Sequence, residues 1–280
     1  MRIGLAQIDV KLGDVETNLN RVRAAIGRAA ADGADLVVAP ELCLSGYAVG
    51  AVDAPLALAA HDPALTALGG APGGCAVAVG FPELGPASRV YNSVSFIDEG
   101  VVQHVHRKLY LPTYHGWEER KHFSAGTAMR AFDTRFGRAA LLVCNDAWQP
   151  ALAFVAIQDG AELLLVPANS SHGDSPELDV RAYWRDITRL YARLFECYVV
   201  FVNRVGEERG AQFWGGSHIV DPLGEMVCEG PEDDEWVAVT PKLDLAVVRE
   251  RRRRMPLNRD ARLAMLRREL TRLIDEGGDL

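Results

Sequence analysis

The chain has 280 residues, of which 49% are hydrophobic and 24% charged, and its formal net charge is −8 at pH 7. This length can bury a sizeable core in one large or two small α/β domains. The acidic balance argues against a general nucleic-acid binder, and no apolar run approaches the roughly 20 residues that a membrane helix needs.

The cysteines and the N-terminus indicate where the protein works. Five cysteines, scattered singly and odd in number, do not have the pattern of a disulfide framework. They fit a reducing compartment in which free thiols survive, so we expect a cytoplasmic protein. The first residues, Met1–Gln7, turn polar too soon for a signal peptide.

The N-terminal third of the chain predicts a βαβ unit. A first strand is expected over residues 3–8, and a continuous apolar strand over 36–39, as in a sheet covered on both faces. Between them, apolar residues at helical spacing predict a helix: Leu19, Val22, Ile26, Ala29 and Ala30. Glu41 lies where the second strand ends.

The next segment leads to a lysine. Residues 50–70, rich in Ala, Pro and Leu, favour a helix with loose ends, and residues 75–81 a buried strand. Residues 91–97 and 101–106 predict a hairpin that turns at 98–100 and leads directly to Lys108.

Two features of this region have alternative interpretations. The loop 111–120 is rich in polar and aromatic residues, and such loops are more often functional than filler. His104 and His106 alternate on the hairpin and could face one metal ion, but a solvated hairpin is favoured because no further ligand cluster is apparent.

A cysteine follows the next strand. Residues 139–143 predict a short buried strand that ends at Cys144, and a helix is expected over 150–158. Residues 163–167 predict a strand that runs into the polar segment 168–171.

The remaining elements complete an α/β pattern. Residues 183–196 predict a helix, with one apolar face formed by Ile187, Leu190, Tyr191 and Leu194. Strands are expected over 199–202 and 235–239, and residues 215–225 predict a strand that enters a tight turn.

The residue composition changes after about residue 245, so we expect one domain over 1–245 and a C-terminal arm over 246–280. The basic run 249–254 favours a solvated or subunit-bridging arm. A leucine stripe could pack on its own domain or on a second subunit, and it consists of Leu263, Leu266, Leu270 and Leu273.

Glu41, Lys108 and Cys144 each follow a predicted strand, and the carboxyl ends of strands are where catalytic groups collect in α/β folds. Alone, each has an ordinary explanation, since free cysteines are usually small buried hydrophobes. Together they suit attack on a carbonyl or nitrile carbon. A carboxylate can take the thiol proton, and an ammonium can stabilise the oxyanion with the backbone N–H after the cysteine.

The motifs around these residues resemble the carbon–nitrogen hydrolases of the nitrilase superfamily. The resemblance spans roughly residues 1–245, and its motifs occur in the family's order. They are the glutamate motif Pro40–Tyr47, the lysine motif Arg107–Pro112, the cysteine motif Val143–Asp146, the helix residues Ala192, Arg193 and Glu196, and the late segments Phe213–Ser217 and Asp221–Glu225.

This resemblance implies a four-layer α-β-β-α sandwich, as a single domain with a C-terminal arm, that forms a homodimer or higher homo-oligomer. It implies that Cys144 attacks to form a thioester, Glu41 shuttles the proton and Lys108 holds the oxyanion. It also implies a second active-site glutamate, for which Glu119 matches and Glu118 is the competing choice.

Substrate contacts also follow from the resemblance. Tyr114, six residues after Lys108, matches a substrate-contacting tyrosine of glutaminase-type relatives. Asn145 departs from the family pattern, in which this position is often aromatic or glutamate, and so changes the pocket wall. Four further residues are expected near the pocket: Tyr47, Trp148, Asn169 and Ser171.

The segments around Lys108 and Glu119 look most like the glutaminase domain of NAD synthetases. That domain uses a basic residue after its serine-rich segment, whereas here no Lys or Arg follows Ser171 until Arg181, and no synthetase domain follows. We therefore expect a free-standing amidase that converts a small amide to acid and ammonia.

Nitrilase and N-carbamoyl hydrolase activities are alternatives within the class, and a non-catalytic binding or scaffold protein is the alternative outside it. The expected partner is a small-molecule amide, with no nucleic acid, membrane, metal or organic cofactor.

Overall fold

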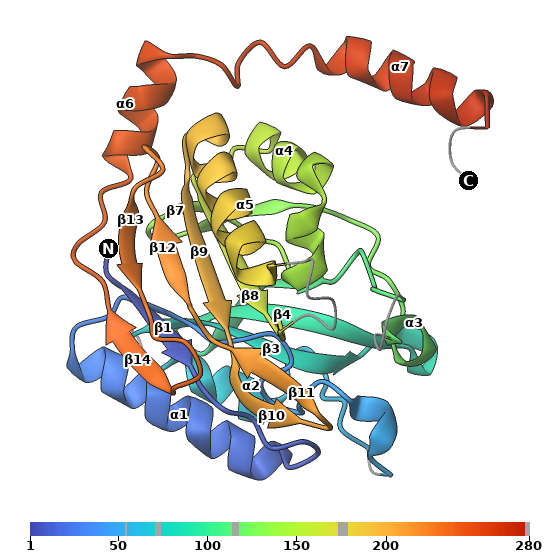
Figure 1. The fold of residues 1–280 in the computed structure, drawn as a ribbon, viewed down its shortest axis with the longest axis vertical. Coiled ribbons are helices and arrows are strands. Elements are labelled where there is room, and N and C mark those ends of the chain that lie inside the picture. The colour runs from blue at the N-terminus through green and yellow to red at the C-terminus, as the bar shows by residue number, and fades with distance from the viewer. Residues whose placement is uncertain (54, 71–73, 114–117, 173–178, 278–280) are drawn as a thin grey trace.

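The computed structural model describes residues 1–53, 55–70, 74–113, 118–172 and 179–277. Tyr114, a predicted substrate contact, lies outside these residues. Within the described residues, two six-stranded sheets and one two-stranded sheet form the framework (Figure 1).

The first sheet has the strand order β14-β1-β2-β3-β4-β5. β1, β2 and β3 are parallel to one another, and the other pairs are antiparallel. The strands are β1 Ile3–Gln7, β2 Leu36–Val38, β3 Ala76–Leu84, β4 Val90–Asp98, β5 Val101–Arg107 and β14 Trp236–Val239. The predicted hairpin is therefore β4–β5, and its turn lies where the sequence indicated.

The second sheet has the order β13-β12-β9-β8-β7-β6, with β7, β8 and β9 parallel. Its strands are β6 Ala131–Thr134, β7 Gly137–Leu141, β8 Leu163–Ala168, β9 Tyr198–Asn203, β12 His218–Val220 and β13 Met226–Glu229. A separate antiparallel hairpin consists of β10 Val205–Glu208 and β11 Ala211–Trp214.

Helices cover the outer face of each sheet. The α-helices are α1 Val15–Ala31, α2 Pro63–Thr66, α3 Glu119–His122, α4 Pro150–Gln158, α5 Val180–Phe195, α6 Ala246–Arg254 and α7 Leu263–Asp275. The 3₁₀ turns are η1 Val49–Ala51, η2 Ala67–Gly69, η3 Pro86–Ser88 and η4 Cys144–Trp148. None of the described helices is long and apolar enough to cross a membrane.

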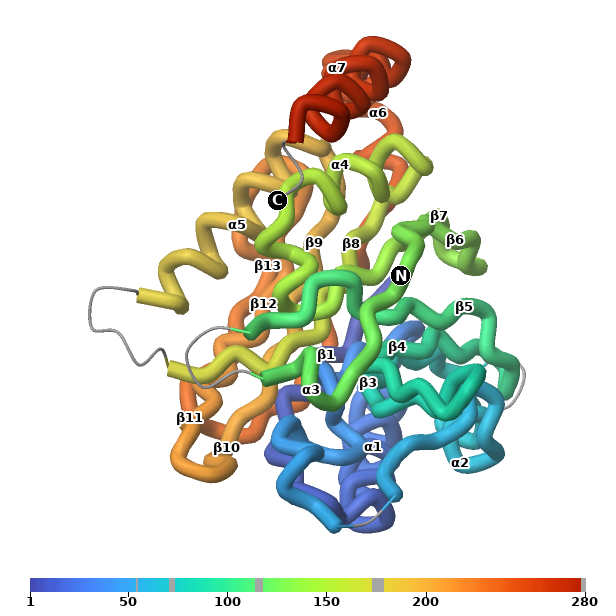
Figure 2. The backbone as a smooth tube through the Cα atoms, turned by 90° about the vertical axis from the view of Figure 1, so that its right-hand side faces the viewer, coloured from blue at the N-terminus to red at the C-terminus, as the bar shows by residue number. Residues whose placement is uncertain are grey.

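Three hydrophobic clusters explain the layers. Side chains of both sheets meet in one cluster, for example Leu5 and Phe96 of the first sheet with Leu141 and Val200 of the second. The other two clusters lie between α1 and the first sheet, and between α4 with α5 and the second sheet. The continuous apolar strands are thus buried on both faces, and the predicted α-β-β-α sandwich is confirmed (Figure 2).

Two sequence expectations about helices were wrong. The described part of residues 50–70 forms only the short elements η1, α2 and η2, because Pro55 and Pro63 each prevent a helix from continuing through them. In α5, Leu190 and Leu194 are about half exposed, while the buried face carries Trp184, Thr188, Tyr191, Ala192 and Phe195. The large aromatic residues determine which face packs on the sheet, and the leucines remain at the surface.

Two arginines of the basic run contact the domain, and the expected solvated hairpin is wrong. Arg249 donates two hydrogen bonds to Glu162, and Arg252 donates to the carbonyls of Ala161 and Phe195, so α6 is attached to the domain. His106 is buried, and His104 stacks on Phe132. The hairpin is therefore not solvated on this face.

The last helix lies beyond α4 and α5 at one end of the molecule in both views (Figures 1 and 2). None of its residues is buried, and Leu263, Leu270 and Leu273 of the predicted leucine stripe are about half exposed. Within this single chain the stripe therefore does not pack on its own domain.

Buried His218 predicts an acid-sensitive fold. Its ring lies 2.8 Å from the Gly216 carbonyl oxygen and 2.9 Å from Thr188 Oγ1, and burial lowers its pKa to about 4. Between pH 6.5 and 4 the unfolded chain binds this proton and the folded chain does not, so stability falls as the pH falls. We expect up to about 3 kcal/mol of this loss to disappear in His218→Gln, measured by urea unfolding at pH 7 and pH 4.5. Equal losses of stability in the wild-type protein and in His218→Gln would contradict this prediction.

Candidate active site

A buried glutamate follows strand β2. Glu41 is fully buried, and the backbone turns sharply at the next residue, Leu42, which has a φ of 44°. Strand β3 passes close to this turn at Gly80, where an added Cβ would lie 2.5 Å from both Pro40 O and Leu42 N. Only glycine allows the two backbones to come this close, so β3 packs directly against the Glu41 turn.

The Lys108 ammonium lies between two carboxylates. Lys108 Nζ donates to Glu41 Oε1 and to Glu119 Oε1, each at 2.7 Å, and all three side chains are buried. Burial alone would lower the pKa of Lys108, but the charges of Glu119 and Glu41 raise it well above its usual value. The lysine is therefore a permanent cation in this site.

Both sheets hold the Glu41 carboxylate in place. Asn92 Nδ2 of β4 donates to Glu41 Oε1 at 2.7 Å, and the backbone N–H of Asn169, after β8, donates to Oε2 at 2.8 Å. With Lys108, three donors fix both oxygens, so the carboxylate has a single orientation.

Glu119 has a different environment. Burial raises the pKa of its carboxyl to about 7, against the lowering effects of the Lys108 ammonium and the Tyr47 hydroxyl. Tyr47 Oη donates to Glu119 Oε1 at 2.5 Å. Glu118, the competing residue, is exposed and pairs with Lys121, so only Glu119 reaches the lysine.

Cys144 begins η4 at the tight turn that follows β7, and it has a φ of 47° that non-glycine residues rarely adopt. Asp146 supports the turn from a fully buried position. Its carboxylate accepts from the backbone N–H groups of Val143, Leu109 and Tyr110. The same carboxylate lies 2.9 Å from His106 Nε2, so one aspartate ties the cysteine turn to residues on both sides of Lys108.

The charges of the buried cluster act on the Cys144 thiol. Burial raises the pKa of this thiol well above its usual value, the Glu41 carboxylate raises it further, and the Lys108 ammonium opposes the rise. The structure thus brings together Glu41, Lys108 and Cys144, which follow three separate strands, and Glu119, which begins α3.

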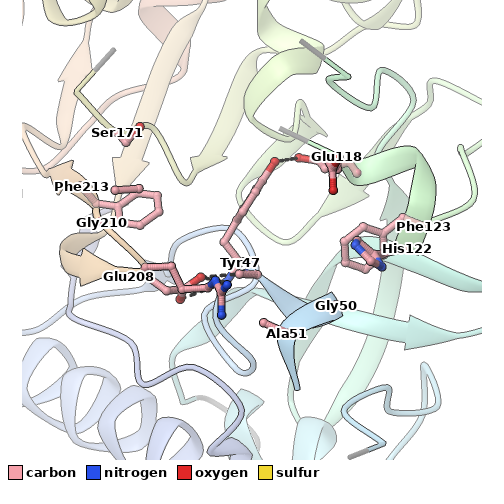
Figure 3. A pocket seen from close by; sticks show the side chains of 14 residues that line it. Tyr47, Gly50, Ala51, Glu118, His122, Phe123, Ser171, Glu208, Gly210 and Phe213 are labelled. Carbon is pink, nitrogen blue, oxygen red and sulfur yellow. Dashed lines mark hydrogen bonds between the residues drawn. The ribbon is translucent and has the colours of Figure 1, made fainter. Parts of the chain in front are cut away.

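A cavity of about 580 Å³ opens beside this cluster. Tyr47 extends across it between the β10–β11 hairpin and α3, and Phe123 and Phe213 lie on opposite sides (Figure 3). Ser171, one of the residues expected near the pocket, also lines this cavity.

The other predicted pocket residues lie nearby in different roles. Asn169 is buried next to Glu41, whereas the Asn145 side chain donates to the Tyr110 carbonyl at 3.2 Å. Trp148 stacks on Tyr183 and meets Trp184 edge-on, so it belongs to the aromatic packing under α5.

Sequence reasoning missed the residues that support the cluster. The sequence indicates Asp146 only as part of the cysteine motif, and nothing in the sequence distinguishes Asn92. The position of Asp146 two residues after the cysteine was a usable signal, but Asn92 lies far away in the sequence. Among the described residues no group of three His, Cys, Asp or Glu side chains is arranged to hold a metal ion.

The sequence profile described as "Carbon-nitrogen hydrolase" matches residues 2–253, which is most of the chain. The chain belongs to the carbon–nitrogen hydrolase family. Its curated relatives are enzymes with different names. It is 34% identical over 269 residues to an (R)-stereoselective amidase of Pseudomonas sp., covering 95% of this chain and 93% of the relative.

Two other relatives of this carbon–nitrogen hydrolase match over part of their own length. An N-carbamoylputrescine amidase of Arabidopsis thaliana is 32% identical, over 61% of each chain. A glutamine-dependent NAD(+) synthetase of Xylella fastidiosa is 31% identical, over 92% of this chain and 46% of the relative. The matched region thus spans about half to three-fifths of these two relatives.

Solved structures agree on the fold of this carbon–nitrogen hydrolase. An amidase from Nesterenkonia sp. superposes with a TM-score of 0.76 at 25% identity, covering 96% of this chain and 95% of that one. A carbon–nitrogen hydrolase from Helicobacter pylori gives 0.81 at 24% identity, covering 94% and 96%.

Proposed function

We propose that this carbon–nitrogen hydrolase is a thiol-dependent amidase, which cleaves a small amide to an acid and ammonia through a thioester on Cys144. The observation that carries the proposal is the buried Lys108 ammonium, held between Glu41 and Glu119 beside the Cys144 turn. A charged cluster of this kind is costly to bury and clusters of perturbed groups favour a catalytic site.

In the first step the sulfur of Cys144 attacks the amide carbon. Because the pKa of the thiol is raised, the group is protonated at neutral pH, and a base must take its proton during the attack. Glu41 is the proposed base, and it then passes this proton to the leaving nitrogen as the C–N bond breaks. Lys108 and the backbone N–H of Asn145 stabilise the oxyanion.

In the second step a water molecule attacks the thioester. Glu41 again takes a proton, now from water, and returns it to the sulfur as the acid leaves. Glu119 keeps Lys108 oriented and assists in placing substrate and water.

Unpaired polar atoms support a substrate site next to this cluster. Both side-chain polar atoms of Asn169, together with Glu119 Oε2 and Asn92 Oδ1, are buried and make no hydrogen bond within the described residues. Buried polar atoms without partners are costly, so a polar group of the substrate or water is expected to bind them. We infer that Asn169 and Ser171 contact the substrate.

Hydrolysis of an N-carbamoyl group is a second candidate. The similarity to N-carbamoylputrescine amidase favours it, and the same residues would attack a ureido carbon. Glutamine is less favoured, because Arg181, the first cation after Ser171 in the sequence, is paired with Glu232.

We further propose that residues 1–245 carry the reaction, that residues 246–280 form an arm, and that the protein works as a cytoplasmic homodimer. The half-exposed leucines of α5 and α7 support association, since exposed apolar patches often mark interfaces. All five cysteines are free thiols, which fits a reducing compartment.

The test is ammonia release from a panel of amides, N-carbamoyl compounds and nitriles, before and after iodoacetamide treatment. We expect release from at least one amide or N-carbamoyl compound, and loss of release in step with carboxamidomethylation of Cys144, located by peptide mass spectrometry. Uniform slow labelling of all five cysteines with no release from any compound would favour the scaffold alternative.

A further inference from the structure

A buried glutamate outside the catalytic cluster binds the backbone that carries Tyr47. Glu208, at the end of β10, is buried, and its Oε1 accepts from the N–H groups of Tyr47 and Ala48 at 3.0 and 2.7 Å. Glu208 is far away in the sequence from both residues. The carboxylate therefore binds the backbone of Tyr47 and Ala48, which follow β2, from the separate β10–β11 hairpin.

A buried arginine holds this glutamate in turn. Arg204 Nη1 donates to Glu208 Oε2 at 2.8 Å, and Arg204 Nη2 donates to the Val10 carbonyl at 2.9 Å. The guanidinium also packs over the Phe213 ring, with 4.3 Å to the ring centroid. Arg204 is completely buried, so the pair is shielded from water and has one geometry.

The chain bends around the Glu208 carboxylate at a glycine. Gly46 has a φ of 80°, and a Cβ added there would lie 2.6 Å from Glu208 Oε2 and 2.9 Å from Leu12 Cα. Only glycine allows this approach, so the segment before Tyr47 is shaped to receive the carboxylate.

Tyr47 connects the Arg204–Glu208 pair with the catalytic cluster. Its backbone is bound by Glu208, and its hydroxyl donates to Glu119 Oε1, the same oxygen that accepts from Lys108 Nζ. Figure 3 shows Glu208 at the base of the cavity and the Tyr47 ring rising from it toward α3.

We propose that Glu208, held by Arg204, is a positioning residue that acts on Glu119 through Tyr47. It touches neither Lys108 nor Cys144, and its effect on the reaction passes through the hydroxyl of Tyr47. This inference depends on the proposed hydrolase activity only for its kinetic test.

The consequence concerns the ionisation of Glu119. The groups that face Glu119 are Lys108, Glu41, Tyr47 and Cys144. The Tyr47 hydrogen bond lowers the pKa of Glu119, so loss of this bond raises that pKa from its value of about 7. A hydrogen bond to a charged group corresponds to a shift of about one pH unit.

The experiment compares four variants with the wild-type protein: Glu208→Gln, Tyr47→Phe, the double variant, and Glu207→Gln as control. Glu207 is exposed on the same strand, so its substitution removes the same charge without touching Tyr47. Two pH profiles are recorded between pH 5 and 9. The first is kcat/KM for the amide, N-carbamoyl compound or nitrile that releases ammonia fastest, and the second is the rate at which iodoacetamide alkylates Cys144. The second needs no turnover.

We expect the inflection near pH 7 to move upward by about one unit in Tyr47→Phe and in the same direction in Glu208→Gln. The double variant should move no further than Tyr47→Phe, because both act through one bond. Glu207→Gln should keep the wild-type profile. A wild-type inflection in folded Glu208→Gln, or additive shifts, would overturn the inference. Absence of turnover with any compound would refute only the proposed function, since the alkylation profile still decides this one.

Discussion

Replacing Cys144 with alanine or serine is expected to reduce kcat/KM by about 1,000-fold or more, since the substitution removes the nucleophile. Serine is the sharper variant, because its hydroxyl has nearly the same size but is a much poorer nucleophile at neutral pH. Both side chains keep the Cβ, and Asp146 still holds the turn through its bonds to Val143, Leu109 and Tyr110. The thermal unfolding temperature should therefore stay close to the wild-type value.

Cys228→Ala is the matched control for this prediction. Cys228 is also a free, partly exposed cysteine, and it lies on β13 away from the cluster. It should keep full activity. Ammonia release by folded Cys144→Ser at more than a tenth of the wild-type rate would contradict a thioester mechanism.

Lys108→Met is expected to abolish measurable turnover and also to destabilise the fold by about 3–5 kcal/mol at pH 8. Methionine has a similar length but leaves Glu41 and Glu119 buried with no cation between them. At lower pH the loss should shrink. Without the ammonium the pKa of Glu119 rises above 7, so the folded protein then takes up a proton that relieves the repulsion.

The control for this variant is Lys121→Met, which removes an exposed lysine paired with Glu118. Surface pairs contribute little, so its stability should change by less than about 1 kcal/mol. Urea unfolding of both variants at pH 6 and pH 8 measures the difference. A pH-independent loss in Lys108→Met would exclude the two carboxylates as its cause.

The layers of the fold could be predicted, because hydrophobic periodicity and the residues at strand ends can be recognised within short stretches of sequence. The apolar run before Cys144 and the hairpin before Lys108 identified their strands from neighbouring residues alone. Helix α5 shows the limit, because Leu190 fits an apolar stripe as well as Trp184 does, and only the sheet beneath decides which is buried.

The polar framework of the site could not be predicted for a related reason. Asn92, His106 and Glu208 are ordinary residues in their own segments. Each gains its role from a partner distant in the sequence: Glu41 for Asn92, Asp146 for His106 and Tyr47 for Glu208. Hydrogen bonds across sheets leave no periodic signal, so only coordinates reveal them.

The cluster is shared between the two sheets: Glu41 and Lys108 follow strands of the first, and Cys144 and Asn169 follow strands of the second. β14, near the end of the chain, completes the first sheet, and β12 and β13 complete the second, so neither sheet can be finished before most of the polypeptide has been synthesised. In a nascent chain Cys144 is therefore separated from Glu41 and Lys108 until the two sheets pack on each other, and the buried cluster exists only in the finished molecule.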